Sequence, residues 1–182
     1  MTAFVDYLAA QVVEKGTPAL VGLDPRLEQL PDSLARLAVK GNAEAVSSAY
    51  LQFCCGVIDV VAPLVAAVKP QAAFFEQCGP HGMSALADVM QYARQSGLLV
   101  ILDGKRNDIG STAVAYATAY LGREGSAWGA DALTVSPYLG EDSLDPFLQT
   151  ASARSAGIFV LVKTSNPGGG LFQDLKVDGK PL

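Results

Sequence analysis

Residues 98–112 read LLVILDGKRNDIGST, and this stretch decides the fold. Its first five residues are all apolar, which predicts a strand buried on both faces, as in a parallel sheet covered by helices. Charged residues follow where the strand ends: Asp103, Lys105 and Asp108. The stretch therefore places polar chemistry at the C-terminal end of a parallel strand.

The same pattern, a short apolar strand next to a longer amphipathic helix, recurs along the chain. Strands are predicted at 18–24, 64–69, 98–103, 131–136 and 157–164. Helices are predicted at 3–15, 42–62, 84–96, 112–121 and 142–156, and the Gly-rich tail 165–182 is expected to be irregular. Asn42 is the expected N-cap of the second helix. The alternation predicts an α/β fold with a parallel sheet.

Two parallel architectures fit this pattern, an open doubly wound sheet and a closed barrel. No G-x-G-x-x-G follows the first strand, which argues against a dinucleotide site. Polar residues end every strand: Asp24, Lys69, Asp103, Ser136 and Thr164–Ser165. Function spread over successive strand ends is typical of the (β/α)₈ TIM barrel, which usually needs ~250 residues. We therefore expect residues 1–182 to form a single, incomplete TIM-barrel domain with about the first five βα units.

Composition narrows the class of protein. The chain is 50% hydrophobic and 17% charged, which is typical of a globular domain, and its net charge of -5 argues weakly against nucleic acid or an anionic membrane as partner. The N-terminus shows no export signal, so we expect a cytoplasmic protein. Cys54, Cys55 and Cys78 are expected to be reduced packing residues, and His81 to lie in a surface loop. With one histidine, catalysis would rest on Lys, Asp and backbone groups.

The charges after the central strand are the strongest chemical signal. Asp103 and Lys105 are two residues apart, so their side chains should point to the same side, toward the barrel mouth. Charges flanked by apolar sequence are tolerated when they are paired. A D-x-K pair alone could be a strand-end ion pair, whereas the full D-x-K-x-x-D-I-G-x-T string favours a catalytic site. Ser111 or Thr112 is expected to cap the next helix.

The string DGKRNDIGST resembles the signature of the orotidine 5′-phosphate decarboxylase family, in particular its longer bacterial subgroup. Four further blocks resemble the family in the same order: GLDPR (22–26), VKPQAAFFE (68–76), SPYLGEDSL (136–144) and VKTSNPG (162–168). Asn107 stands where that family most often has Gly. The resemblance implies a TIM-barrel homodimer that converts orotidine 5′-phosphate to UMP with neither metal nor organic cofactor.

The resemblance also implies roles for four charged residues. Lys105 would deliver a proton to C6 of the pyrimidine as CO₂ leaves, and Asp103 would lie against the substrate carboxylate. Lys69 would complete a Lys-Asp-Lys-Asp array and reach a ribose hydroxyl, and Asp108 would enter the site from the partner subunit. A lysine held between two aspartates would supply both a fixed charge and a proton to the carbanion that decarboxylation generates.

Three more residues would contact the nucleotide by the same resemblance. Asp24 would bind the ribose, Thr112 would contribute across the dimer interface, and Ser165 would bond the pyrimidine edge. The residues alone also allow plainer interpretations, since Asp24 could start a turn, Lys69 could be a solvated strand end, and Ser165 could belong to an Asn-Pro-Gly turn.

Two alternative functions stay open from the sequence. One is an Mg²⁺-dependent decarboxylase or aldolase of the same barrel superfamily that acts on a sugar phosphate. The other is a truncated, non-catalytic remnant. In the resembled family, groups on the last two strands, a Gln-containing loop and an Arg hold the phosphate, and these 182 residues contain no matching segment. We therefore expect a fragment of a longer enzyme, with reduced rate and affinity and with open sheet edges.

Overall fold

Five parallel strands form the centre of the protein. A computed structural model describes residues 3–38 and 41–181. The strands are β1 (Leu20–Leu23), β2 (Ala67–Pro70), β3 (Leu99–Arg106), β4 (Ala132–Val135) and β5 (Gly157–Val160). Each strand pairs with its predecessor in the order β1-β2-β3-β4-β5. This order has no reversal, unlike a doubly wound sheet, and it confirms the expected partial barrel.

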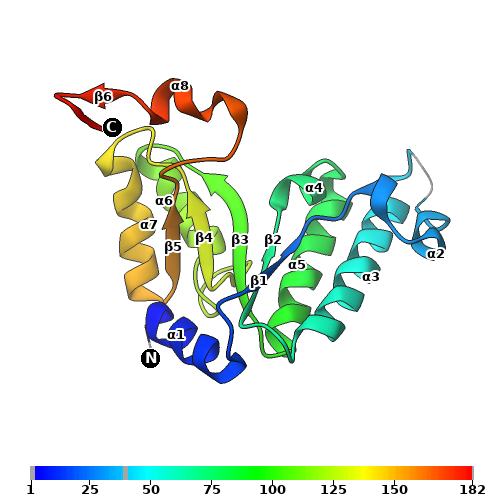
Figure 1. The fold of residues 1–182 in the computed structure, drawn as a ribbon. Coiled ribbons are helices and arrows are strands. Elements are labelled where there is room, and N and C mark those ends of the chain that lie inside the picture. The colour runs from blue at the N-terminus through cyan, green and yellow to red at the C-terminus, as the bar shows by residue number, and fades with distance from the viewer. Residues whose placement is uncertain (1–2, 39–40, 182) are drawn as a thin grey trace.

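Helices connect the strands and, apart from the N-terminal helix α1, cover one face of the sheet. The main helices are α1 (Phe4–Lys15), α3 (Ala43–Val61), α4 (Ala72–Glu76), α5 (Gly79–Gln95), α6 (Gly110–Tyr120) and α7 (Glu141–Ala153). Shorter elements are η1 (Leu27–Gln29), α2 (Asp32–Ala35), η2 (Pro167–Gly169), α8 (Gly170–Gln173), β6 (Lys176–Val177) and β7 (Lys180–Pro181). In Figure 1, α8 and β6 lie beyond the C-terminal ends of the strands, whereas α1 lies beyond their N-terminal ends.

Alternate residues of the strands enter two different apolar clusters. The larger cluster lies between the sheet and the helices, and its strand residues include Val68, Val100, Leu102, Leu133 and Val135. The smaller cluster lies on the opposite face, and it consists of Phe4, Ala67, Leu99, Ile101 and Ala132. We call this second surface the inner face. Both faces of the central strands are thus buried, as their continuous apolar runs predict.

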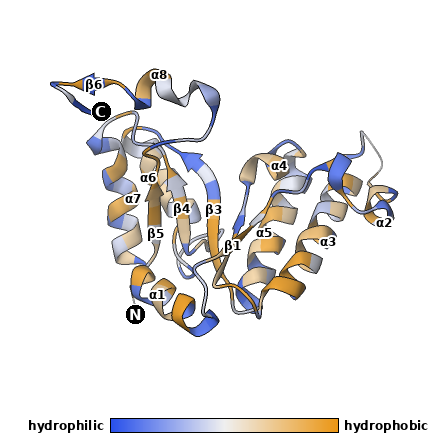
Figure 2. Cartoon of the chain, viewed as in Figure 1, coloured by the Kyte–Doolittle hydropathy of each residue, from blue (hydrophilic) through white to orange (hydrophobic). Residues whose placement is uncertain are grey.

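Helix α1 covers the lower part of the inner face. The Phe4 ring meets the Phe159 ring edge to face, with centroids 6.1 Å apart. A Cβ atom at Gly157 would lie 2.2 Å from the Phe4 ring, so the start of β5 must be a glycine for the helix to pack this closely. The inner face is therefore closed by apolar groups at its N-terminal end, and polar side chains occur at its C-terminal end. Figure 2 shows the same gradient along β3, which is hydrophobic toward its N-terminal end and largely hydrophilic toward its C-terminal end.

The predicted strand boundaries fail mainly at the sheet edges. The last strand is predicted to reach residue 164 but ends at Val160, because its only partner in the described residues, β4, ends at Val135. Edge position also leaves Leu20 and Phe159 about two fifths exposed. Burial on both faces is therefore correct for β2, β3 and β4 but not for the edge strands.

The predicted helix boundaries fail where the short helix α4 packs against the start of α5. Residues 72–76 form helix α4, which periodicity did not reveal, and α5 begins at Gly79 rather than at 84. His81 is therefore exposed in the first turn of α5, not in a loop. Pro80 fits there because a first-turn residue needs no amide hydrogen. A Cβ at Gly82 would lie 1.9 Å from the Phe75 carbonyl oxygen, so glycine permits the tight junction.

Helix α3 matches its prediction closely. The Asn42 side chain accepts a hydrogen bond from the Ala45 amide at 3.0 Å and so caps the helix as expected. Length and apolar content alone would suit α3 to a membrane span. Cys54 and Ile58 of α3 are nevertheless fully buried in the larger cluster, where the helix packs against α5. The three cysteines are free thiols.

Candidate active site

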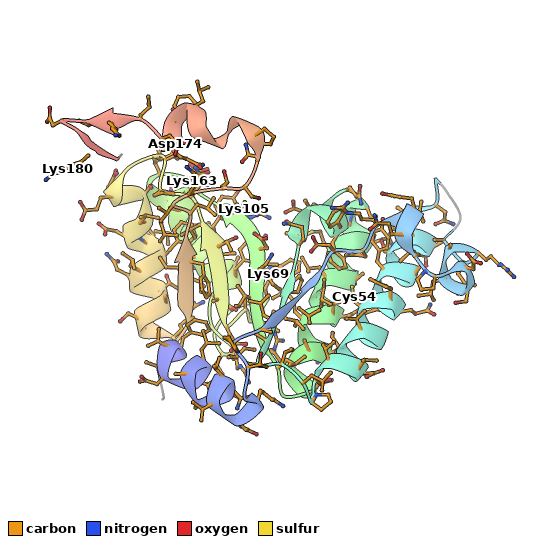
Figure 3. The ribbon with its side chains drawn as sticks, viewed as in Figure 1. Cys54, Lys69, Lys105, Lys163, Asp174 and Lys180 are labelled. Carbon is orange, nitrogen blue, oxygen red and sulfur yellow. The ribbon has the colours of Figure 1, made fainter. Side chains whose placement is uncertain are left out.

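The carboxylate of Asp103 is the centre of a polar cluster at the C-terminal end of the sheet. Its Oδ1 atom accepts hydrogen bonds from Lys105 Nζ at 2.7 Å and from Thr134 Oγ1 at 2.9 Å. Its Oδ2 atom accepts bonds from Lys69 Nζ at 2.7 Å and from Gln71 Nε2 at 3.1 Å. Each carboxylate oxygen therefore has two donors, which orient the group completely. Figure 3 labels the two lysines on the neighbouring strands β2 and β3.

The strand pattern explains why these side chains meet. Lys69, Asp103 and Thr134 each lie two residues beyond a member of the inner-face cluster, so the alternation of strand side chains directs them to the inner face as well. Because β2, β3 and β4 are neighbours and parallel, their C-terminal ends lie together. The apolar inner face thus continues into a ring of charged and hydroxyl groups.

Lys105 reaches the cluster through an irregularity of β3. Leu102 pairs with Leu133 and Arg106 pairs with Val135, so β3 advances four residues where β4 advances two. We call residues 103–105, which occupy this register shift, the bulge. Lys105 has a φ of 43°, in the left-handed region that costs a non-glycine residue of order 1–3 kcal/mol. The two side chains do share one side, as predicted, although a regular strand is not what brings them there.

Burial and charge act in opposite directions on Asp103. Its side chain is 8% exposed, and this desolvation would raise the pKa of the carboxyl. Hydrogen bonds from Lys105, Lys69 and Thr134, together with the charge of Lys69, outweigh burial and lower the pKa of Asp103 below its usual value. The carboxylate is therefore ionised at neutral pH. With two ammonium groups against it, the cluster carries a formal charge of +1.

The two lysines differ in how much solvent they meet. The Lys69 side chain is 30% exposed and that of Lys105 is 46% exposed. Lys105 is thus fixed on one side by a buried carboxylate and open on the other. An ammonium held in this way can present a proton to a molecule bound at the inner face.

The other predicted site residues lie at the same end of the sheet but outside this cluster. Asp108, half-buried in the loop before α6, bonds the Ile109 amide at 2.8 Å. Thr112 is exposed in the first turn of α6. The expected Ser111 or Thr112 cap is wrong, because α6 begins at Gly110 and no side chain caps its N-terminus. Asp24 follows β1, Ser165 follows β5 in the chain, and both are exposed.

Two polar partners of Asp103 were missed at the sequence level. Thr134 is a hydroxyl residue within the otherwise apolar strand β4. It lies two residues after Ala132, on the inner face, and this alternation could have revealed it. Gln71 lies two residues after Lys69, which places its side chain on the same side as that lysine. Lys69, in turn, is not a solvated strand end but a direct partner of the buried carboxylate.

The loop that carries Ser165 is held by α8. The Gln173 side chain accepts a hydrogen bond from the Thr164 amide at 2.8 Å and donates one to Thr164 Oγ1 at 2.9 Å. Lys163 also forms an ion pair with Asp174, and both are labelled in Figure 3. The tail that was expected to be irregular therefore fixes the residue before Ser165.

No group of three or more His, Cys, Asp or Glu side chains suited to a metal ion occurs in residues 3–38 and 41–181. The chemistry that the described groups themselves offer is a fixed positive charge beside a buried anion. That arrangement suits a reaction that develops negative charge on a bound molecule near Lys105.

Comparison with known proteins gives a consistent result. Residues 20–181 match the sequence model of the orotidine 5′-phosphate decarboxylase / HUMPS family. The whole chain is 60% identical to the orotidine 5′-phosphate decarboxylase of Rhodopirellula baltica and covers 61% of that protein. It is 39% identical to the enzyme of the same name from Caldicellulosiruptor saccharolyticus, of which it covers 63%. The chain therefore spans about three fifths of the length of these curated relatives.

Solved structures agree with the fold. A Streptomyces avermitilis protein assigned as an orotidine 5′-phosphate decarboxylase superposes with a TM-score of 0.85 at 39% identity, over 100% of this chain and 61% of that one. Leishmania donovani OMP decarboxylase gives a TM-score of 0.76 at 35% identity, over 99% of this chain and 61% of that one.

Proposed function

The chain belongs to the orotidine 5′-phosphate decarboxylase / HUMPS family, and from that premise we propose that it acts in the cofactor-free decarboxylation of orotidine 5′-phosphate to UMP. The observation that carries the proposal is the buried Asp103 carboxylate bound by both Lys69 and Lys105 at 2.7 Å. The names of the relatives, decarboxylases of this substrate, support the same reaction.

In this proposal Lys105 is the proton donor. When the bond between C6 and the substrate carboxylate breaks, the electron pair stays on C6 and CO₂ leaves. The Lys105 ammonium stabilises the developing negative charge and then transfers a proton to C6, which gives UMP. Its bond to Asp103 keeps the ammonium in place, so little reorganisation is needed as charge develops.

Asp103 has two tasks in this reaction. It anchors both lysines, since each of its oxygens accepts a hydrogen bond from one ammonium group. It also places a second carboxylate beside that of the substrate, whose loss as neutral CO₂ removes the repulsion. The lowered pKa of Asp103 supports this role, because the group must remain charged.

The remaining site residues are assigned by their resemblance to the family. Asp24 would bind the ribose, Lys69 would reach a ribose hydroxyl, and Ser165 would bond the pyrimidine edge. Asp108 and Thr112 would act in the site of a partner subunit, so the functional unit would be a homodimer, which we expect in the cytoplasm. Their positions outside the Asp103 cluster are compatible with action in trans.

One assay tests the reaction and separates it from the Mg²⁺-dependent alternative. The purified chain is mixed with orotidine 5′-phosphate, and the loss of pyrimidine absorbance is followed with EDTA and, in parallel, with Mg²⁺. We expect the same rate in both. Activity that appears only with Mg²⁺ would favour the sugar-phosphate branch of the superfamily, and no turnover under either condition would contradict the proposal for this chain. The relatives reported above favour neither that branch nor a non-catalytic remnant.

A further inference from the structure

Arg106, the residue after Lys105, lies on the opposite face of β3 from the Asp103 cluster. Its guanidinium carbon lies 5.6 Å from the centroid of the Tyr116 ring and 5.5 Å from that of Tyr120, both on α6. One terminal nitrogen forms an ion pair with Glu76 of α4 and lies 3.5 Å from the Tyr120 hydroxyl. The side chain is 18% exposed, so the charge is largely enclosed between two helices.

The second terminal nitrogen of the guanidinium forms a hydrogen bond with the bulge. Arg106 Nη1 donates to the carbonyl oxygen of Gly104 at 3.1 Å. From the inner face, Thr134 Oγ1 accepts a hydrogen bond from the Lys105 amide at 2.9 Å. Backbone groups within the register shift cannot all pair with β4, and buried ones are costly when left unpaired. These two side chains satisfy a carbonyl and an amide of the bulge from opposite faces of the strand.

We infer that Arg106 is a positioning residue, which holds the bulge of β3 in the shape that directs Lys105 toward Asp103. Its anchor is external to the strand, since Glu76, Tyr116 and Tyr120 belong to α4 and α6. Lys105 has a strained left-handed backbone, which persists only when its surroundings fix it. Arg106 supplies part of that constraint without touching the inner face.

An arginine suits this task better than a lysine would. Two separate terminal nitrogens serve Glu76 and Gly104 at once, while the flat group packs against aromatic rings. Burial would lower the pKa of Arg106, but its bonds to Tyr120 and Glu76 raise it, so the group stays charged. A lysine could keep the ion pair but has a single nitrogen for both partners.

The test compares Arg106→Lys and Arg106→Met with the wild-type chain. A matched control is Arg123→Met, which removes an arginine paired with buried Asp131 at the other end of the sheet. The first measurement is amide hydrogen exchange at Lys105, with Ile101 as the internal reference. The second is kcat and KM for orotidine 5′-phosphate, which rests on the proposed function, whereas the exchange measurement does not.

For both Arg106 variants we expect exchange at Lys105 to be at least tenfold faster, with exchange at Ile101 unchanged. We expect kcat to fall about tenfold, which corresponds to ~1.4 kcal/mol, with KM within about twofold. Arg123→Met should lower the unfolding midpoint and leave both readouts unchanged. Unaltered Lys105 exchange in Arg106→Lys would overturn the inference, and this variant decides the matter if the methionine variant does not fold. If Lys105 exchange is faster in the Arg106 variants and the wild-type chain itself shows no turnover, the positioning role stands and only the proposed reaction is refuted.

Discussion

Replacing Thr134 with valine should weaken the site and the fold together. Valine has nearly the same shape, so the change replaces a hydroxyl with a methyl group and removes both of its hydrogen bonds. That hydroxyl donates a hydrogen bond to Asp103 at 2.9 Å and accepts one from the Lys105 amide at 2.9 Å. The residue is 8% exposed, so water cannot readily replace these bonds. A hydrogen bond to a charged group contributes ~1.5–3 kcal/mol and a neutral one ~0.5–1.5 kcal/mol. The expected loss of unfolding free energy is therefore about 2–4.5 kcal/mol.

Urea unfolding measures this loss, with Trp128 as a fluorescent reporter, since it is the one tryptophan in the chain. At an m-value of ~2 kcal/mol/M the midpoint should fall by ~1–2 M with an unchanged slope. Thr134→Ser is the matched control, because it keeps the hydroxyl and loses one methyl group, worth ~1 kcal/mol. If the valine variant loses no more stability than the serine variant, the hydroxyl contributes no more than a methyl group, ~1 kcal/mol, and the reasoning is refuted.

Three further predictions concern titration, thiol chemistry and the α3 cap. Because the pKa of Asp103 is lowered in the fold, its stabilising effect is present above its unfolded pKa of ~3.9 and is lost as pH falls through the lower folded value. The stability difference between wild type and Asp103→Asn should therefore be constant from pH 7 to ~5 and shrink below ~4 in urea titrations. The pKa of Cys54 is raised to about 12, chiefly by burial and then by the neighbouring Cys55 and Asp24. Mass spectrometry should therefore find Cys54 alkylated at pH 8 only after unfolding, whereas the half-buried Cys55 should be labelled first. Asn42→Ala should cost ~1 kcal/mol in the same urea assay, because the Ala45 amide loses its cap, and an unchanged midpoint would contradict that role.

The sequence was most informative where periodicity and burial agree. The central strands are apolar on both faces, and the charged residues follow directly at their C-terminal ends, so both the sheet and the position of Lys69, Asp103 and Lys105 could be predicted. Asn42 was recognisable as a cap because it directly precedes a long apolar pattern. In each case a local rule and the tertiary structure favour the same outcome.

Other features depend on contacts between distant segments. Helix α4 has five residues, too few to show a period, and α5 starts early because Gly82 allows close contact with Phe75. The bulge of β3 shows only in its register with β4, so the backbone of Lys105 could not be foreseen. In the sequence, Arg106 is one more charged residue in a polar segment. Its role depends on contacts with α4 and α6, which the sequence does not show.

The central claim is that Lys105, fixed by Asp103, protonates C6 as CO₂ departs. Its most direct test is CO₂ release from carboxyl-labelled orotidine 5′-phosphate by the 182-residue chain and by Lys105→Ala, with UMP measured in the same samples. General acid catalysis contributes about 10²–10⁴-fold. We expect equal amounts of CO₂ and UMP from the wild type and a rate at least ~100-fold lower from a folded Lys105→Ala variant. A folded variant that releases CO₂ at the wild-type rate would contradict the claim.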